Sequence, residues 1–241
     1  MIRVKLAGTI IGDGKVKICI PISAQNDAEL AEELEYIAAS PCDIAEVRFD
    51  YWQGKAGPSH EGILENVKRK LGKTPLLFTY RTSIEGGLGT NSRDDYYSIN
   101  AASIRSGHID LIDIEFAKEP ELVVALIEMA RKSDIKVIVS KHFFGKSLSK
   151  DEIIETLCKM QNKDADIIKL AVSVYDDKGA RDVISAAKEM YEKYAKIPLV
   201  TIGMGEHGKV TRRIEPFYGS AITYARGIRA TAPGQLDWRQ L

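Results

Sequence analysis

The sequence predicts an α/β protein built as one (β/α)₈ barrel, and three observations favour this fold. Apolar segments of strand length alternate with amphipathic helical segments along the chain, which is typical of parallel sheets. The repeat is about thirty residues, the size of a βαβ unit. Eight such repeats fit the 241 residues, a common length for this barrel. The alternative is an open doubly wound sheet, but no G-x-G-x-x-G segment follows the first strand.

The chain begins with a short predicted hairpin. Residues 2–15 alternate weakly between apolar and polar side chains and end in Gly12-Asp13-Gly14, which is typical of a hairpin turn. A strand is expected next, at residues 16–22. Asn26 and Glu29 then have the spacing of a capping box, which predicts the start of the first helix.

The alternation of strands and helices continues to the end of the chain. Further strands are expected at residues 42–50, 75–81, 109–115, 135–140, 166–172, 197–202 and 220–225. Helices are expected at 59–71 and 92–106, from Pro120, from the capping box Ser149/Glu152, from Asp176, and around 209–214. No long linker interrupts the pattern, so residues 1–241 are predicted to form one domain with the hairpin at 1–15.

Composition excludes several classes of function. Hydrophobic residues make up 44% of the chain, and Lys plus Arg equals Asp plus Glu at 34 each. Nucleic-acid partners are not expected, because they usually require a basic face. No apolar run has the length of a membrane span, and the N-terminus lacks a signal-peptide pattern. Three distant cysteines and four scattered histidines argue against a disulfide framework or a metal site. We therefore expect a cytoplasmic protein without a membrane partner.

One lysine stands out in the predicted strand 166–172. Lys169 is the charged residue in the middle of this apolar run. Burial disfavours the charged ammonium, so the pKa of this amine is expected to fall. A neutral amine is a nucleophile toward carbonyl groups. The alternative is an ordinary edge-strand lysine that extends its amine to water, and the polar residues at the other strand ends favour the catalytic interpretation.

Polar residues gather where the other predicted strands end, which is the edge at which barrel enzymes place their active sites. They include Glu46, Arg48, Asp50, Arg81, Glu85, Asp113, Glu115, His142, Arg212, Thr231 and Gln235. Taken singly, each has a structural explanation, such as an ion pair. Together, the arginines favour an anionic, hydroxylated substrate, because a guanidinium fits a carboxylate in a bidentate way. Lysine with histidine favours imine formation and proton abstraction beside a carbonyl.

Several of these segments resemble, in the same order, the motifs of type I 3-dehydroquinate dehydratases. The matching motifs are E-x-R-x-D at 46–50, F-T-x-R-T-x-x-E-G-G at 78–87, S-x-H-x-F at 140–144, K-x-A at 169–171, M-G-x-x-G-x-x-S-R at 204–212 with Thr211 in the serine position, G-S-A at 219–221 and A-P-G-Q at 232–235. The resemblance covers nearly the whole chain. Several motifs in register are far more specific than any one of them.

The resemblance implies a TIM barrel closed at its bottom by the N-terminal hairpin, a homodimer, and no metal or cofactor. The implied reaction is the dehydration of 3-dehydroquinate to 3-dehydroshikimate in the shikimate pathway. By the family pattern, Lys169 forms the imine, His142 removes the C2 proton and later protonates the departing hydroxyl, and Glu85 orients His142. The other implied contacts are Arg212 with the substrate carboxylate, Glu46, Arg48, Arg81 and Gln235 with hydroxyls, Met204 beside the site, and Thr231 in a lid loop at 230–236.

Two departures and two alternatives accompany this resemblance. Leu241 comes six residues after Gln235, so the eighth helix is expected to be only a turn or two. Thr231 also stands where a serine is common.

A class I aldolase would also use a strand-six lysine, but it would usually bind a phosphate near the last two strands. This chain has Arg212 and a Thr-Ala-Pro-Gly-Gln loop there instead of a glycine-rich phosphate site. A non-catalytic barrel that binds small acids would not need a buried lysine near a histidine.

Overall fold

The computed structural model describes residues 2–52 and 60–241 and confirms the predicted barrel. Eight strands form one parallel sheet in the order β10-β3-β4-β5-β6-β7-β8-β9. These strands are β3 (Lys17–Ile22), β4 (Ile44–Arg48), β5 (Leu76–Thr79), β6 (Leu111–Glu115), β7 (Lys136–Phe143), β8 (Ile167–Ser173), β9 (Leu199–Met204) and β10 (Ile222–Tyr224). A parallel bridge between Leu199 and Ser220 brings the two ends of the sheet together.

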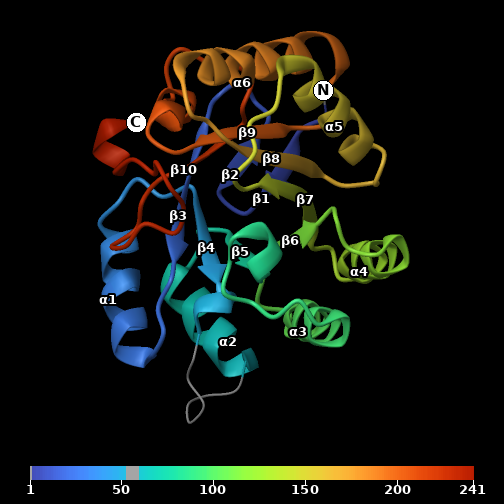
Figure 1. The fold of residues 1–241 in the computed structure, drawn as a ribbon. Coiled ribbons are helices and arrows are strands. Elements are labelled where there is room, and N and C mark those ends of the chain that lie inside the picture. Colours follow the sequence, from blue (N-terminus) through green and yellow to red (C-terminus); the bar gives the residue numbers. More distant parts are fainter. Residues whose placement is uncertain (1, 53–59) are drawn as a thin grey trace.

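Helices surround this ring of strands (Figure 1). They are α1 (Asp27–Ala38), α2 (His60–Leu71), α3 (Arg93–Arg105), α4 (Pro120–Lys132), α5 (Lys150–Gln161) and α6 (Asp177–Glu189). The side chain of Asn26 caps α1 as predicted, but Glu29 accepts the backbone N–H of Gln25 and leaves the capping box incomplete. Ser149 and Glu152 form the full box at α5. The predicted start of α2 at residue 59 lies outside the described residues. In the described ranges, no helix is long and apolar enough to cross a bilayer.

The N-terminal hairpin is present, but the prediction of its turn was wrong. β1 (Val4–Leu6) pairs with β2 (Thr9–Ile11) in antiparallel register, so the turn falls at Ala7 and Gly8 instead of at 12–14. Gly8 has φ 84°, a left-handed conformation that glycine adopts without a Cβ penalty and that two-residue hairpin turns need. The hairpin lies within the ring of strands in Figure 1. Its Val4 and Ile11 pack on the lowest apolar layer inside the barrel, so it closes the bottom.

The end of the chain carries only short helices. The short helix expected around 209–214 is the 3₁₀ helix η4 (His207–Arg212), and the eighth helix is η5 (Trp238–Gln240), as short as expected. A Cβ on Gly208 would lie 2.4 Å from the carbonyl carbon of Gly203, so η4 packs directly on the end of β9 as a tight turn. The other short helices are η1 (Phe49–Tyr51), η2 (Ser83–Glu85) and the π-helical turn η3 (Met190–Tyr194).

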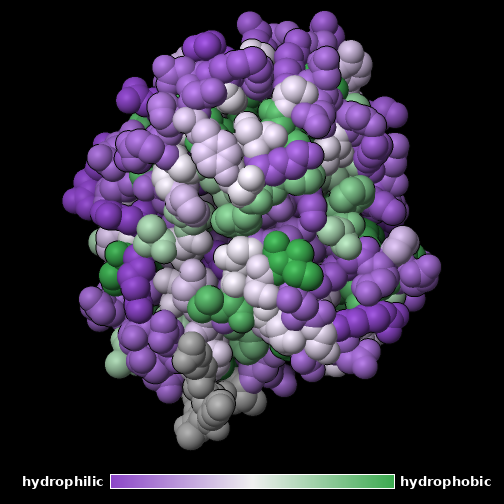
Figure 2. Space-filling model, viewed as in Figure 1, coloured by the Kyte–Doolittle hydropathy of each residue, from purple (hydrophilic) through white to green (hydrophobic). Residues whose placement is uncertain are grey.

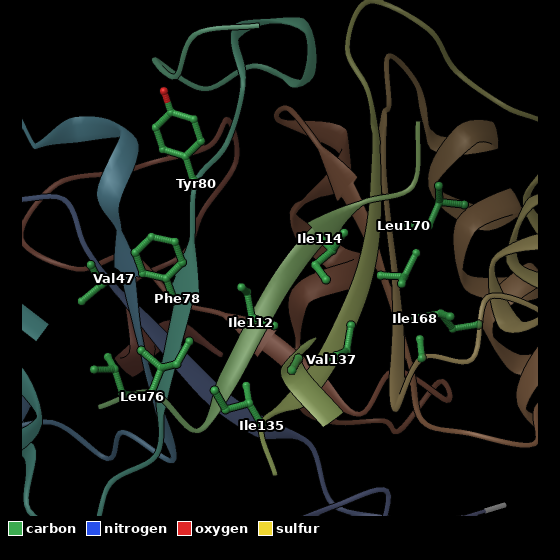
Figure 3. Packing of buried hydrophobic residues seen from close by; sticks show 14 of the residues in the cluster. Val47, Leu76, Phe78, Tyr80, Ile112, Ile114, Ile135, Val137, Ile168 and Leu170 are labelled. Atoms are coloured by element: carbon green, nitrogen blue, oxygen red, sulfur yellow. The ribbon is translucent and has the colours of Figure 1, made fainter. Parts of the chain in front are cut away.

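Side chains alternate between two cores along the barrel strands. One set, which includes Leu76 and Phe78 of β5 and Ile112 and Ile114 of β6, packs in the larger cluster between the strands and the helices (Figure 3). The residues between them point into the barrel, where the lower layer is apolar. Above it, toward the carboxyl ends of the strands, lies a buried polar layer of Glu46, Thr79, Asp113, Ser140 and Lys169. The fold therefore places charged groups where barrel enzymes act.

Outside the barrel, His60 makes the stability of the fold depend on pH. Its ring stacks on Phe49 at 4.1 Å between centroids, and its Nε2 lies 2.7 Å from Ser103 Oγ. Burial lowers the pKa of His60 to about 4, below the value of about 6.5 for an unfolded chain. Between these values the unfolded state binds the proton and the folded state does not. Stability is therefore expected to fall as pH drops from about 6.5 to about 4.

The substitution His60→Phe is expected to remove this loss while keeping the ring stack. Urea unfolding at several pH values measures the contribution of His60, which is the free energy of unfolding of the wild type minus that of the variant. This difference should stay constant above about pH 7.5, where it reports packing alone, and should decline through the window from about 6.5 to about 4. Parallel profiles for the two proteins across that window would contradict the assignment.

Candidate active site

Lys169 lies inside the barrel on β8 and is 4% exposed. Its Nζ is 3.3 Å from Asp113 Oδ2, 4.0 Å from Glu46 Oε1 and 4.1 Å from the ring centroid of Tyr224. Lys169 therefore lies in a buried apolar strand, as predicted, but carboxylates and an aromatic ring from other strands face its amine. Ile168 and Leu170, on either side of it in β8, pack outward toward the helices, whereas the groups that face the amine come from β4, β6 and β10 across the barrel.

A pocket opens above this lysine at the carboxyl ends of the strands. It is partly open to solvent and is lined by side chains from several strands of the barrel. The surrounding face is mostly hydrophilic, with small hydrophobic patches near its middle (Figure 2). The predicted site residues that line the pocket are Glu46, Arg48, His142, Lys169, Met204, Arg212, Thr231 and Gln235. Arg81 and Glu85 lie behind this lining.

Glu85 holds His142 in place. Strand β7 continues past its predicted end at residue 140 and carries His142 to the pocket. One carboxylate oxygen of Glu85, Oε2, lies 3.0 Å from His142 Nδ1 and accepts the backbone N–H of His142 at 3.0 Å. Lys141 donates to the other oxygen at 3.0 Å. Burial, followed by the charges of Arg81 and Lys169, holds the pKa of His142 well below its usual range. The imidazole is thus a neutral base at pH 7.

Arg81 acts behind the pocket as a bridge between acids. Its Nη2 donates to Asp113 at 2.8 Å, and its Nη1 lies 3.4 Å from Glu85, 3.2 Å from Glu115 and 3.0 Å from Ser140 Oγ. Burial opposes ionisation of Asp113, but the charges of Arg81, Lys169 and His142 and the hydrogen bond from Ser140 together outweigh it and hold the pKa of Asp113 well below its usual range. The guanidinium of Arg81 therefore holds Asp113 beside Lys169 and Glu85 beside His142. Through these two carboxylates it positions the groups that line the pocket.

Arg212 is a buried cation to which no described carboxylate forms an ion pair. It is 2% exposed. Its Nη1 and Nη2 donate to the carbonyl oxygens of Tyr224 at 3.5 Å and Pro233 at 3.2 Å, and its buried Nε has no described partner. Burial lowers the pKa of Arg212 to about 10, so it stays charged at pH 7. By contrast, Arg48 is held by Asp50 through bonds of 2.9 and 2.8 Å. Arg212 is the guanidinium available to an anionic ligand.

Residues 230–236 fold over the pocket as a compact loop. Oε1 of Gln235 accepts the backbone N–H groups of Thr231 at 2.6 Å and Ala232 at 3.2 Å. Gly234 has φ 76°, and a Cβ there would lie 2.3 Å from the carbonyl oxygen of Gly205, so only glycine permits this approach. Together with the bond from Arg212 to Pro233, these contacts tie the loop to the end of β9.

Sequence reasoning gave no role to two residues that the structure places beside Lys169. Asp113 was noted as an acid at a strand end, and its spacing of two from Glu115 was the available signal that it faces inward. Tyr224 carried no signal, because a tyrosine in a strand is ordinary. Their closeness to the lysine arises across the barrel and not along the chain.

The fold and the pocket define a barrel enzyme that carries an amine, an imidazole and a guanidinium, to which no carboxylate of the described residues is paired, at the carboxyl ends of its strands. A family model described as type I 3-dehydroquinase matches residues 18–241, and the chain belongs to this family.

Individual relatives agree with this assignment. A 3-dehydroquinate dehydratase of Clostridioides difficile (strain 630) is 33% identical over 240 residues, which is 99% of this chain and 94% of that protein. A 3-dehydroquinate dehydratase of Enterococcus faecalis is 37% identical and covers 94% of this chain and 90% of its own length. A crystal structure of the type I enzyme from Clostridium difficile, with covalently modified comenic acid, has a TM-score of 0.92, with 33% identity and coverage of 99% of this chain and 94% of that one.

Proposed function

We propose that this chain is a type I 3-dehydroquinate dehydratase, which converts 3-dehydroquinate to 3-dehydroshikimate by syn elimination of water through an imine at Lys169. The observation that carries the proposal is a 4%-exposed lysine amine in a pocket that also holds His142 and an unpaired Arg212. Membership of the type I 3-dehydroquinase family supports the choice of substrate. The reaction belongs to the shikimate pathway to aromatic amino acids.

In the first stage, Nζ of Lys169 gives up a proton and attacks the C3 carbonyl carbon. The resulting carbinolamine loses its hydroxyl as water, and a C=N⁺ iminium remains. Asp113 and Glu46 lie 3.3 and 4.0 Å from Nζ, so two carboxylates face the cationic nitrogen. An iminium draws electrons more strongly than a ketone does, so the C2–H bond beside it becomes acidic.

In the second stage, His142 transfers the proton. Its neutral imidazole takes the C2 proton, and the electron pair of that bond forms an enamine with C3. The enamine then pushes out the C1 hydroxyl, which accepts the same proton from the imidazolium and leaves as water. Hydrolysis of the remaining iminium releases the product and restores the Lys169 amine. Glu85 keeps the imidazole oriented and stabilises its charge while it carries the proton.

The remaining residues bind the substrate in this proposal. Arg212 holds the carboxylate, because a buried guanidinium without a paired acid needs an anion. Hydroxyls are bound by Glu46, Arg48, Thr231 and Gln235, with Met204 packed beside the ring. Arg81, expected to bind a hydroxyl directly, is assigned a positioning role through Glu85 and Asp113. We further propose that residues 1–241 form one domain and that residues 230–236 act as a lid. We also propose that the protein is cytoplasmic and forms a homodimer. Light scattering would test the dimer.

An absorbance assay tests the activity. The product has a carbon–carbon double bond conjugated with its carbonyl, so enone absorbance should appear when purified protein is mixed with 3-dehydroquinate and no cofactor. An aldolase would cleave a carbon–carbon bond without forming this enone, and a non-catalytic binding protein would leave the substrate intact. Absence of the enone at high protein concentration rejects the proposed activity.

The substitution Arg212→Ala is expected mainly to raise KM, because the carboxylate contact exists in both the ground state and the transition state. Losing one partner of a buried charge pair costs about 2–5 kcal/mol, which is roughly 30- to 4,000-fold in affinity. Steady-state kinetics with 3-dehydroquinate measure the change in KM. Arg213→Ala is the matched control, because Arg213 is the next residue but is exposed. An unchanged KM in Arg212→Ala, or an equal rise in both variants, contradicts the role of Arg212.

A further inference from the structure

Tyr224 is a buried polar residue of the pocket that the mechanism above does not use. It ends strand β10, lines the pocket and is 4% exposed. Its hydroxyl is fully buried and has no hydrogen-bond partner among the described residues. An unpaired buried hydroxyl costs about 1–3 kcal/mol, and native proteins contain few of them. The hydroxyl therefore calls for a functional explanation.

The polar groups around Tyr224 are already engaged with other partners. Glu46 accepts a hydrogen bond from Thr79 Oγ1 at 2.8 Å, and Asp113 accepts one from Ser140 Oγ at 2.5 Å and another from Arg81. Burial, followed by the negative charges near it, raises the pKa of Tyr224 well above its usual value. The phenol therefore stays neutral and keeps its proton to donate.

The ring of Tyr224 lies against the nitrogen that forms the imine. Its centroid is 4.1 Å from Lys169 Nζ, within the range of a cation–π contact, whose strength grows when the pair is shielded from water. The nitrogen remains cationic in the iminium, so the ring face also suits the intermediate. The hydroxyl lies on this same rigid ring, and in the proposed function the imine carbon is bonded to the nitrogen that the ring faces.

We propose that Tyr224 is a specificity-determining residue: its hydroxyl donates a hydrogen bond to the substrate hydroxyl on the carbon next to the imine carbon, while its ring covers the iminium nitrogen. The ligand class that fits is an α-hydroxy ketone carrying a carboxylate. This inference rests on the proposed function, in which 3-dehydroquinate supplies the C3 ketone and the C4 hydroxyl.

The substitution Tyr224→Phe removes the hydroxyl and keeps the ring. The kcat/KM for 3-dehydroquinate is expected to fall by roughly 10-fold, the size of one neutral hydrogen bond. The 4-deoxy analogue lacks the hydroxyl that Tyr224 is proposed to bind. For this analogue, kcat/KM should be the same in the variant and the wild type. The variant without ligand should melt at the same or a higher temperature, because an unpaired buried hydroxyl has been removed. Tyr194→Phe, which alters a tyrosine that is 45% exposed on the outside of the barrel, should change none of these values.

The outcomes separate this inference from the proposed function. If the wild type forms no enone and is not trapped by borohydride with 3-dehydroquinate, the proposed function fails. If the wild type is active and Tyr224→Phe matches it on both ketones, the hydrogen bond is rejected and the proposed function stands. If the variant melts at a lower temperature and its kcat/KM falls by the same factor for both ketones, Tyr224 has only a structural role. This result also overturns the inference.

Discussion

Replacing Lys169 by alanine is expected to reduce the turnover of 3-dehydroquinate by on the order of 10⁴- to 10⁶-fold, the scale seen when a covalent enzyme loses a central catalytic group. The substitution removes the amine that forms the imine and, with it, the electron sink for the C2 carbanion. The pocket should remain folded, because Asp113 keeps its bond to Arg81 at 2.8 Å. Binding of the product is therefore expected to persist, which separates lost chemistry from lost structure.

Borohydride trapping identifies the amine directly. Reduction in the presence of 3-dehydroquinate should inactivate the wild type and add the mass of the reduced ligand to the peptide that contains Lys169. Lys159→Ala is the control, because its side chain on α5 is 63% exposed, and both its turnover and its labelling should match the wild type. Label on a different lysine, or full turnover in Lys169→Ala, would remove this residue from the mechanism.

Most of the fold was predictable because the barrel repeats a local pattern. Each strand and helix shows its own period of apolar residues, and the strand ends follow from that pattern to within a few positions. The errors occur where tertiary contacts decide the backbone. The hairpin turn lies at Gly8 and not at Gly12–Gly14, although all three of these glycines have positive φ.

The candidate site was predictable as a set of residues but not as an arrangement. Strand ends and motifs identify which side chains reach the rim, whereas partners across the barrel depend on register and tilt. Arg81 was expected to bind a substrate hydroxyl, and the sequence did not indicate that it also lies among Asp113, Glu85 and Glu115. Lys169 was predicted from its apolar strand, whereas the carboxylates and the ring that face it come from other strands. The local sequence does not contain these distances between strands.

The environment of His142 determines how its activity should vary with pH. Burial and the cations Arg81 and Lys169 hold its pKa well below the usual range. A general base is active when it is unprotonated, so the acid limb of kcat/KM that belongs to His142 should lie well below pH 6.5. An exposed histidine would instead lose half of its base form near that pH.

The substitution His142→Ala is expected to lower kcat by roughly 10²- to 10⁴-fold, the usual contribution of general acid–base catalysis, because both the C2 proton and the leaving hydroxyl lose their shuttle. Imine formation uses Lys169, so borohydride should still label that residue in the variant. Stopped enone assays and peptide mass spectrometry measure the two effects. His207→Ala, at a side chain that is 48% exposed, serves as the control and should keep full activity. Near-normal turnover in His142→Ala would move the proton transfer to Glu85 or to water, and loss of labelling would assign His142 to imine formation instead.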